Sequence, residues 1–146
     1  MDESDIRSQI NRCKSSINQL NDNIDELKKQ LQKLCQAKDG VCRKEREFHS
    51  YVESEKRDAV CIGNNDRVKI AREYSGRMNT LLGSSKSGSA FASIEGIKKT
   101  VNSRIEKVND EILKAKQKIN SLQSNINSLN RQLESLLREK KTERCK

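Results

Sequence analysis

Apolar residues recur at alternating steps of three and four near both ends of the chain. Near the C-terminus the repeat comprises Ile105, Val108, Ile112, Ala115, Ile119, Leu122, Ile126, Leu129, Leu133 and Leu136. Near the N-terminus it comprises Ile6, Ile10, Cys13, Ile17, Leu20, Ile24, Leu27, Leu31 and Leu34. This spacing is the heptad pattern of a helix that buries one narrow stripe, called a seam below. The sequence therefore predicts two long helices with matching seams.

The first seam continues more loosely beyond residue 34. The same spacing gives Lys38, Val41, Glu45, Phe48, Val52, Glu55, Ala59 and Ile62, of which five are apolar or small. We therefore predict one helix over about residues 5–62, with Ser4 or Asp5 as its N-terminal cap. Gly40 lies inside it and costs roughly 1 kcal/mol against alanine, which does not break a long helix.

Residues 63–66, Gly-Asn-Asn-Asp, predict a stop and a restart. Gly63 suits the left-handed position that ends many helices, and Asn65 or Asp66 can cap a new helix over about residues 66–82. That short helix carries four apolar residues that we expect on one face: Ile70, Tyr74, Met78 and Leu81.

A glycine- and serine-rich stretch follows, and its composition predicts a flexible loop over residues 83–89. The last helix is expected over about residues 90–143. Its first inward residues would be Phe91, Ile94, Ile97 and Val101, with a shift of the heptad near Lys98, which interrupts the apolar spacing.

The two seams predict an all-α fold, a long antiparallel two-helix hairpin of coiled-coil type formed by one domain over residues 1–146. Placing Ile6 beside Leu136 also places Leu34 near Val108, and it leaves the end of the first helix for the short helix to cover. A homodimer of long helices would also bury the seams, since isoleucine and leucine alternate as in parallel dimers. The hairpin is favoured because an attached partner has a high effective concentration.

The composition fits thin helical seams better than a rounded core. Hydrophobic residues make up 32% of the chain, charged residues 35%, and proline is absent. The mean hydropathy of −0.94 is also typical of disorder, but regular seams argue against that interpretation. The net charge of +9 fits a nucleic-acid-binding or lipid-binding face. The glutamates interleaved with the basic C-terminal residues favour an ordinary solvated helix face instead.

Candidate catalytic chemistry is sparse. The single histidine, His49, lies in a charged stretch and is expected to face solvent, and the five cysteines form no Cys-x-x-Cys pair. We therefore expect reduced thiols, no metal, no cofactor and no enzymatic activity. No apolar leader or membrane-length segment is evident. We expect a cytoplasmic protein that leaves the cell, if at all, together with a partner by a leaderless route.

The middle of the chain is the expected binding region. All four aromatic residues lie between residues 48 and 91, where they either fill the hairpin tip or form a patch for a partner helix. The candidate protein-binding residues are Phe48, Tyr51, Tyr74, Gly76, Met78, Leu81, Leu82 and Phe91.

The pattern resembles the small helical partners of LXG-domain toxins in bacterial type VII secretion, which are relatives of the WXG100 proteins. The resemblance rests on the N-terminal seam, the small-residue region from Tyr74-Ser75-Gly76 to Gly88, the segment Phe91–Ile97 and the C-terminal seam. Tyr74-Ser75-Gly76 takes the place of a Trp-x-Gly turn, and tryptophan is absent. Tyr51-Val52-Glu53-Ser54-Glu55 matches an export pattern but lies inside a helix rather than after the last one.

The resemblance implies a non-catalytic adaptor or targeting chaperone. Such a protein would pack side by side with the helical N-terminal domain of a toxin, keep it in solution and present it for export, with or without a second small helical partner. Two other functions stay open at this point. One is a self-associating coiled-coil scaffold, and the other, less favoured, is a basic rod that binds nucleic acid.

Overall fold

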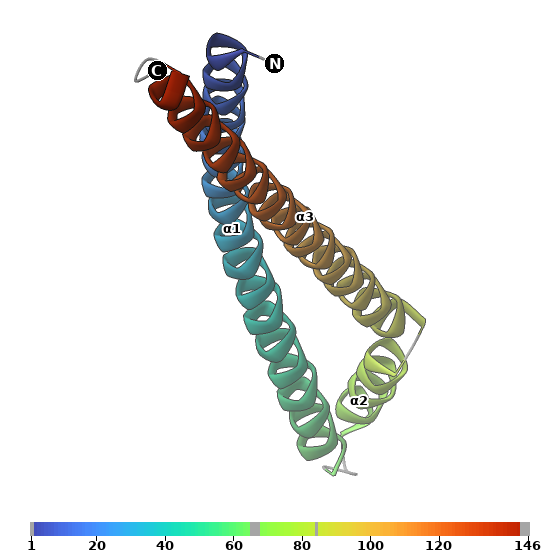
Figure 1. Ribbon diagram of the computed structural model, residues 1–146. Coiled ribbons are helices and arrows are strands. Elements are labelled where there is room, and N and C mark those ends of the chain that lie inside the picture. The colour runs from blue at the N-terminus through green and yellow to red at the C-terminus, as the bar shows by residue number, and fades with distance from the viewer. Residues whose placement is uncertain (1, 65–67, 84, 144–146) are drawn as a thin grey trace. The chain divides into compact units, whose positions relative to one another are not determined.

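Helices are the regular elements of the described chain (Figure 1). The computed structural model describes residues 2–64, 68–83 and 85–143. The helices are α1 (Glu3–Gly63), α2 (Lys69–Leu82) and α3 (Ser85–Glu143). The predicted all-α fold is confirmed: α1 and α3 pair in antiparallel fashion, and a short helix lies between them in the chain. Two compact units are distinguished, unit 1 (residues 1–32 and 106–146) and unit 2 (residues 33–105).

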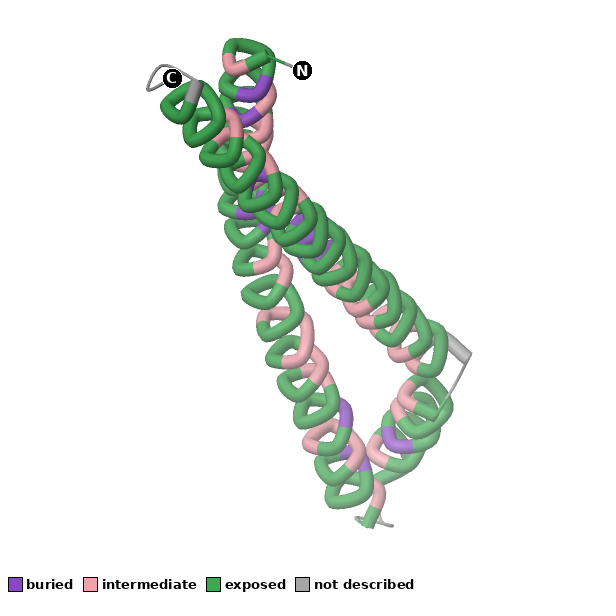
Figure 2. Tube along the Cα trace, viewed as in Figure 1, coloured by how far each residue is buried: buried purple, intermediate pink, exposed green. Residues whose placement is uncertain are grey.

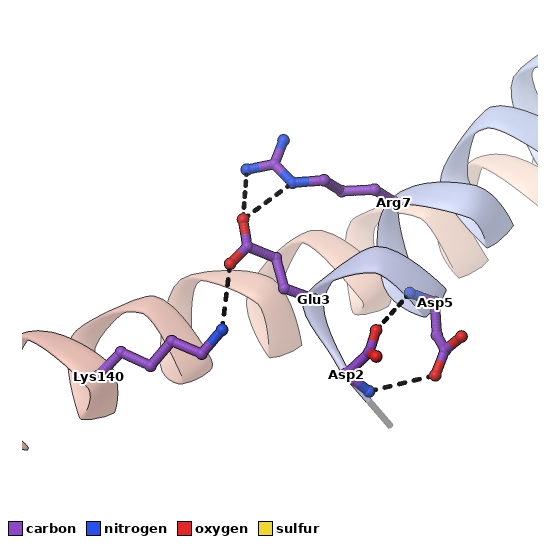
Figure 3. A network of polar contacts seen from close by, with 5 residues as sticks. All are labelled: Asp2, Glu3, Asp5, Arg7 and Lys140. Carbon is purple, nitrogen blue, oxygen red and sulfur yellow. Dashed lines mark hydrogen bonds and ion pairs between the residues drawn. The ribbon is translucent and has the colours of Figure 1, made fainter.

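The first helix begins with a reciprocal cap (Figure 3). The Asp5 backbone N–H donates to Asp2 Oδ1 at 2.8 Å, and the Asp2 backbone N–H donates to Asp5 Oδ2 at 3.3 Å. This is a capping box, in which two otherwise unsatisfied donors find acceptors three residues apart. The prediction of Ser4 or Asp5 as the cap was wrong, because Asp2 holds that position and Asp5 is its partner.

Unit 1 buries the two seams against each other (Figure 2). Ile6, Ile10 and Ile126 form a buried cluster. Partly buried residues that pack against this cluster are Cys13, Ile17, Leu129, Leu133 and Leu136. Val108 is fully buried. Across the helices, Lys140 Nζ lies 3.3 Å from Glu3 Oε2, which confirms the antiparallel pairing (Figure 3).

Unit 2 keeps the same antiparallel spacing. Lys98 Nζ lies 3.0 Å from Glu45 Oε2, and the two residue numbers add to 143, as they do for Glu3 and Lys140. The expected shift of the heptad near Lys98 was therefore wrong. Ile97 is 51% exposed, whereas Lys98 takes the seam position and its charge is matched by the carboxylate of Glu45 on the opposite helix.

A close approach joins α2 to the end of α1. A Cβ added to Gly63 would collide with the hydroxyl of Ser75 and lie 2.9 Å from its Cβ, and Ser75 itself is buried. Gly63 is thus required for packing and not for a left-handed turn, because no described glycine has a positive φ. The predicted cap of the short helix, Asn65 or Asp66, lies outside the described residues. The N-cap of α2 is Val68, which makes no side-chain capping bond, so the prediction of a polar cap was wrong.

The expected loop over residues 83–89 is mostly helix, since α3 begins at Ser85. Ser87 and Phe91 are half-buried at seam spacing, so the heptad continues almost to the start of α3 and outweighs the loop-like composition. The Ser93 hydroxyl donates to the Ser89 carbonyl at 2.9 Å, which gives this polar side chain a partner within the helix. As expected, α1 runs unbroken through Gly40.

Within the described ranges, no helix combines the length and apolar content needed to cross a bilayer.

Candidate protein-binding surface

Two of the predicted binding residues fill the space between α1 and α3 in unit 2. The ring centroids of Phe48 and Phe91 are 4.9 Å apart, and both residues are half-buried. The ring of His49 meets Phe91 edge-on at 5.5 Å, although His49 is exposed, as predicted. Such aromatic pairs contribute packing energy to the fold. Phe48 and Phe91 are therefore primarily core residues.

The inner face of α2 consists of small and flexible residues. Ser75 is buried, and Ala71, Met78 and Leu82 are half-buried. Their steps of four, three and four residues place them on one side of the helix. Met78 and Leu82, both predicted to bind a partner, thus belong to the face that α2 turns toward the rest of unit 2.

A second apolar stripe of α2 lies outside the buried face. Ile70 is 77% exposed, Leu81 50% and Tyr74 43%. At 3.6 residues per turn, these residues fall within about 40° of each other, and the stripe is centred roughly 90° from the buried face. The expectation that Ile70, Tyr74, Met78 and Leu81 share one face was wrong, because only Met78 faces inward.

The exposed stripe also contains a cation. Residues 70, 74, 77 and 81 repeat the steps of four, three and four that characterise a helical seam, and position 77 is Arg77. Arg77 is exposed and forms no ion pair with any residue that the structure describes. The nearby Glu73 has Lys69 as its partner, with 3.8 Å between Lys69 Nζ and Glu73 Oε1. We call Ile70, Tyr74, Arg77 and Leu81 the outer seam of α2.

Most of the exposed large apolar residues of the described chain, those of the outer seam included, belong to unit 2. Of the ten large apolar residues that are exposed in the described chain, eight belong to unit 2, although the units have equal lengths. These eight are Tyr51, Val60, Ile62, Val68, Ile70, Tyr74, Leu81 and Ile97. Tyr51 is 59% exposed and lines a shallow depression on α1 with Arg43, Arg46, Glu47, Ser50 and Ser54. Gly76 is exposed with open space around it, so it makes no close approach.

Charges in unit 2 stabilise the helix pairing at one seam position. Hydrogen bonds from the Lys98 ammonium to Glu45, and then to Glu95 at 3.2 Å, raise the pKa of Lys98 above its usual range. The side chains of Lys98 and Glu45 are 26% and 28% exposed. A polar pair in a heptad seam can specify register, since a slip by one heptad would separate Lys98 from Glu45 and leave the Glu45 carboxylate without its partner. On the exposed surface, the hydrogen bond from Lys44 lowers the pKa of Glu47.

Groups suited to metal binding do not cluster in the described residues, in which no set of three or more His, Cys, Asp or Glu side chains could hold an ion. Cys13 and Cys42 are half-buried free thiols, and Cys35 and Cys61 are exposed free thiols. Cys145 lies outside the described residues. The candidate feature for recognition is the outer seam of α2, whose residues Ile70, Tyr74 and Leu81 are exposed.

The sequence interpretation missed Ile70 and Arg77 as binding candidates. A signal for both was present, because the outer seam has the same spacing as the inner face and lies one residue before it. Two stripes about 90° apart on one helix cannot both face the same neighbour. The sequence alone did not indicate which one would pack inward.

Comparisons with protein-family models, with curated proteins and with solved structures find no match to this chain.

Proposed function

We propose that this protein is a non-catalytic adaptor that binds a helical domain of another protein by side-by-side helix packing. The observation that carries the proposal is the concentration of exposed large apolar residues in unit 2, eight against two in unit 1. Contiguous exposed apolar patches are typical of partner sites, and three of the eight residues, Ile70, Tyr74 and Leu81, share one stripe of α2. A helical partner is favoured because the most exposed of these residues, Ile70, belongs to a heptad-spaced stripe.

The proposed partner is the helical N-terminal domain of an LXG-type toxin of bacterial type VII secretion. This part of the proposal comes from the resemblance of the two terminal seams and the small-residue middle of the chain to the partners of such toxins. In this role the protein would cover apolar surface of the toxin in the cytoplasm, keep it in solution and deliver it for export, and either stay behind or leave with it.

Co-expression tests the proposal. The full chain is produced with the N-terminal domain of an LXG toxin encoded beside it, and the tagged toxin domain is purified at moderate ionic strength. The proposal expects a complex with a fixed ratio of the two chains and a toxin domain that is less soluble when produced alone. If the two chains separate in every arrangement of tags, the adaptor function is wrong.

A self-associating scaffold is the second candidate, favoured by the same exposed stripe, because a heptad-spaced face can pair with another copy of itself. Light scattering after size-exclusion chromatography separates the two. A monomer that forms a complex only with the toxin domain supports the adaptor, whereas a homodimer or fibre that persists at low concentration supports the scaffold.

A further inference from the structure

The outer seam of α2 has the geometry of one half of a coiled-coil contact. Its residues follow the four-three-four spacing over about three helical turns, or roughly 18 Å at 1.5 Å per residue. Ile70 and Tyr74 are 77% and 43% exposed, so the fold leaves this stripe in contact with solvent. A second helix laid along it would place its own apolar residues between these side chains.

Charge selects the kind of helix that fits. Unit 2 contains 15 basic and 9 acidic residues, a net charge of +6, and the whole chain carries +9. Arg77 lies inside the outer seam and has no carboxylate partner among the described residues. Covering Arg77 with an entirely apolar helix would bury an unpaired charge, which is costly. A carboxylate on the incoming helix would supply the missing partner.

A second copy of this chain fits less well. Two copies would bring two units of charge +6 together, and like charges oppose association. A nucleic acid would satisfy the positive charge but would leave the aliphatic side chains of Ile70 and Leu81 without apolar partners, because phosphate contacts are polar. Tyrosine and arginine are instead, with tryptophan, enriched among the residues that dominate the binding energy of protein interfaces.

We infer that the outer seam of α2, formed by Ile70, Tyr74, Arg77 and Leu81, docks an acidic amphipathic helix of the partner protein, with one carboxylate of that helix facing Arg77. The inference rests on the proposed adaptor function and specifies its binding site and the chemistry of its partner. At this site the apolar residues supply the binding energy, and Arg77 selects the partner and the register in which it binds.

The test uses the full-length protein and two stapled helical peptides of about three heptads. Both carry leucine at the seam positions and glutamates on the flanks. One has glutamate at the central seam position, and the other has lysine there. Binding is followed by amide chemical shifts and by fluorescence anisotropy, at low and at physiological salt.

The variants are matched in charge and exposure. Arg77→Glu alters the outer seam, and Arg72→Glu makes the same charge change on the opposite side of α2, where Arg72 is also exposed. Ile70→Asp removes an apolar contact of the outer seam, and Leu113→Asp does the same at a 55% exposed residue of unit 1. Because all four residues are exposed, helical circular dichroism should stay at the wild-type level.

We expect the glutamate peptide to bind wild-type protein with shifts confined to α2 and its neighbours. Arg77→Glu should weaken it about tenfold or more and reverse the preference toward the lysine peptide, and Ile70→Asp should weaken both peptides. Arg72→Glu and Leu113→Asp should change affinity less than about threefold, as rim or remote positions do.

Equal losses for Arg77→Glu and Arg72→Glu, shifts outside unit 2, or self-association that the peptides do not compete with would each overturn the inference. The adaptor function is judged separately by co-purification of the toxin domain. If that complex forms and resists Arg77→Glu and Ile70→Asp, the adaptor function stands and this site is wrong. If no complex forms, the adaptor function is wrong whatever the peptides do.

Discussion

Val108 offers a direct test of the paired seams, because it is fully buried on α3 in unit 1. Val108→Ala removes two methyl groups, which lose about 1.6 kcal/mol of burial at about 0.8 kcal/mol each. The cavity left behind adds up to about 1 kcal/mol where the site does not collapse. The better helix propensity of alanine returns about 0.5 kcal/mol. We therefore expect a net destabilisation of about 1–2 kcal/mol, or a drop in Tm of about 3–6 °C for a chain of this size.

The matched control is Leu113→Ala, five residues further along the same helix. Leucine loses more carbon atoms than valine in this change, but Leu113 is 55% exposed. We expect its effect to stay within about 0.5 kcal/mol, as for most surface positions. Both free energies of unfolding are measured by chemical denaturation followed by circular dichroism. A cost for Leu113→Ala equal to or above that for Val108→Ala would show that the helix does not bury the seam that contains Val108.

Three further predictions concern particular contacts. Gly40→Ala should stabilise the protein by about 0.5–1 kcal/mol because open space surrounds Gly40 in a helix, whereas Gly63→Ala should destabilise it because the added methyl group would collide with α2; denaturation curves give both signs. Hydrogen bonds from Arg7 and Lys140 lower the pKa of Glu3, and hydrogen bonds to Glu45 and Glu95 raise the pKa of Lys98. Glu3 therefore contributes to the free energy of unfolding above its unfolded pKa of about 4.3, and this contribution is lost as the pH falls through its pKa in the folded protein. Lys98 contributes to the free energy of unfolding below its unfolded pKa of about 10.4, and this contribution is lost as the pH rises through its pKa in the folded protein. Relative to the wild type, Glu3→Gln should therefore show a smaller fall of Tm toward acid pH, and Lys98→Met a smaller fall of Tm toward alkaline pH. Lys98→Leu alone should lower Tm more than Lys98→Leu combined with Glu45→Leu, since the single change leaves the Glu45 carboxylate in the seam without its ammonium partner; a double variant that melts at or below the temperature of the single variant would contradict this coupling.

The paired seams of unit 1 were predictable from sequence because one energetic term dominates there. On α3, every seam position of unit 1 from Val108 to Leu136 is apolar, and each is buried or half-buried in the structure. Burial of a regular stripe decides both the helix and the face it presents. The position of Lys98 was not predictable in the same way. Its place in the seam depends on Glu45, which lies 53 residues away and becomes its neighbour only once the register is set.

Exposed apolar residues could be predicted for the middle of the chain, but the face of α2 that stays exposed could not. The inner face and the outer seam have equal spacing and differ by one residue, so periodicity favours neither. The choice is made by tertiary contact: Gly63 permits the close approach of Ser75, and this fit turns Ile70 and Tyr74 outward. A less apolar face packs inward because its small residue fits the neighbouring helix. Such complementarity of shape is not visible in one segment alone.

Hydrogen exchange tests the central claim most directly, namely that the outer seam of α2 is where a helical partner docks. Amide exchange is compared for the full-length protein alone and in complex with the LXG toxin domain. We predict slower exchange on complex formation in residues 69–82, with no change in residues 108–136, whose seam is already buried. Protection confined to residues 108–136, with α2 unchanged in the complex, would contradict the account.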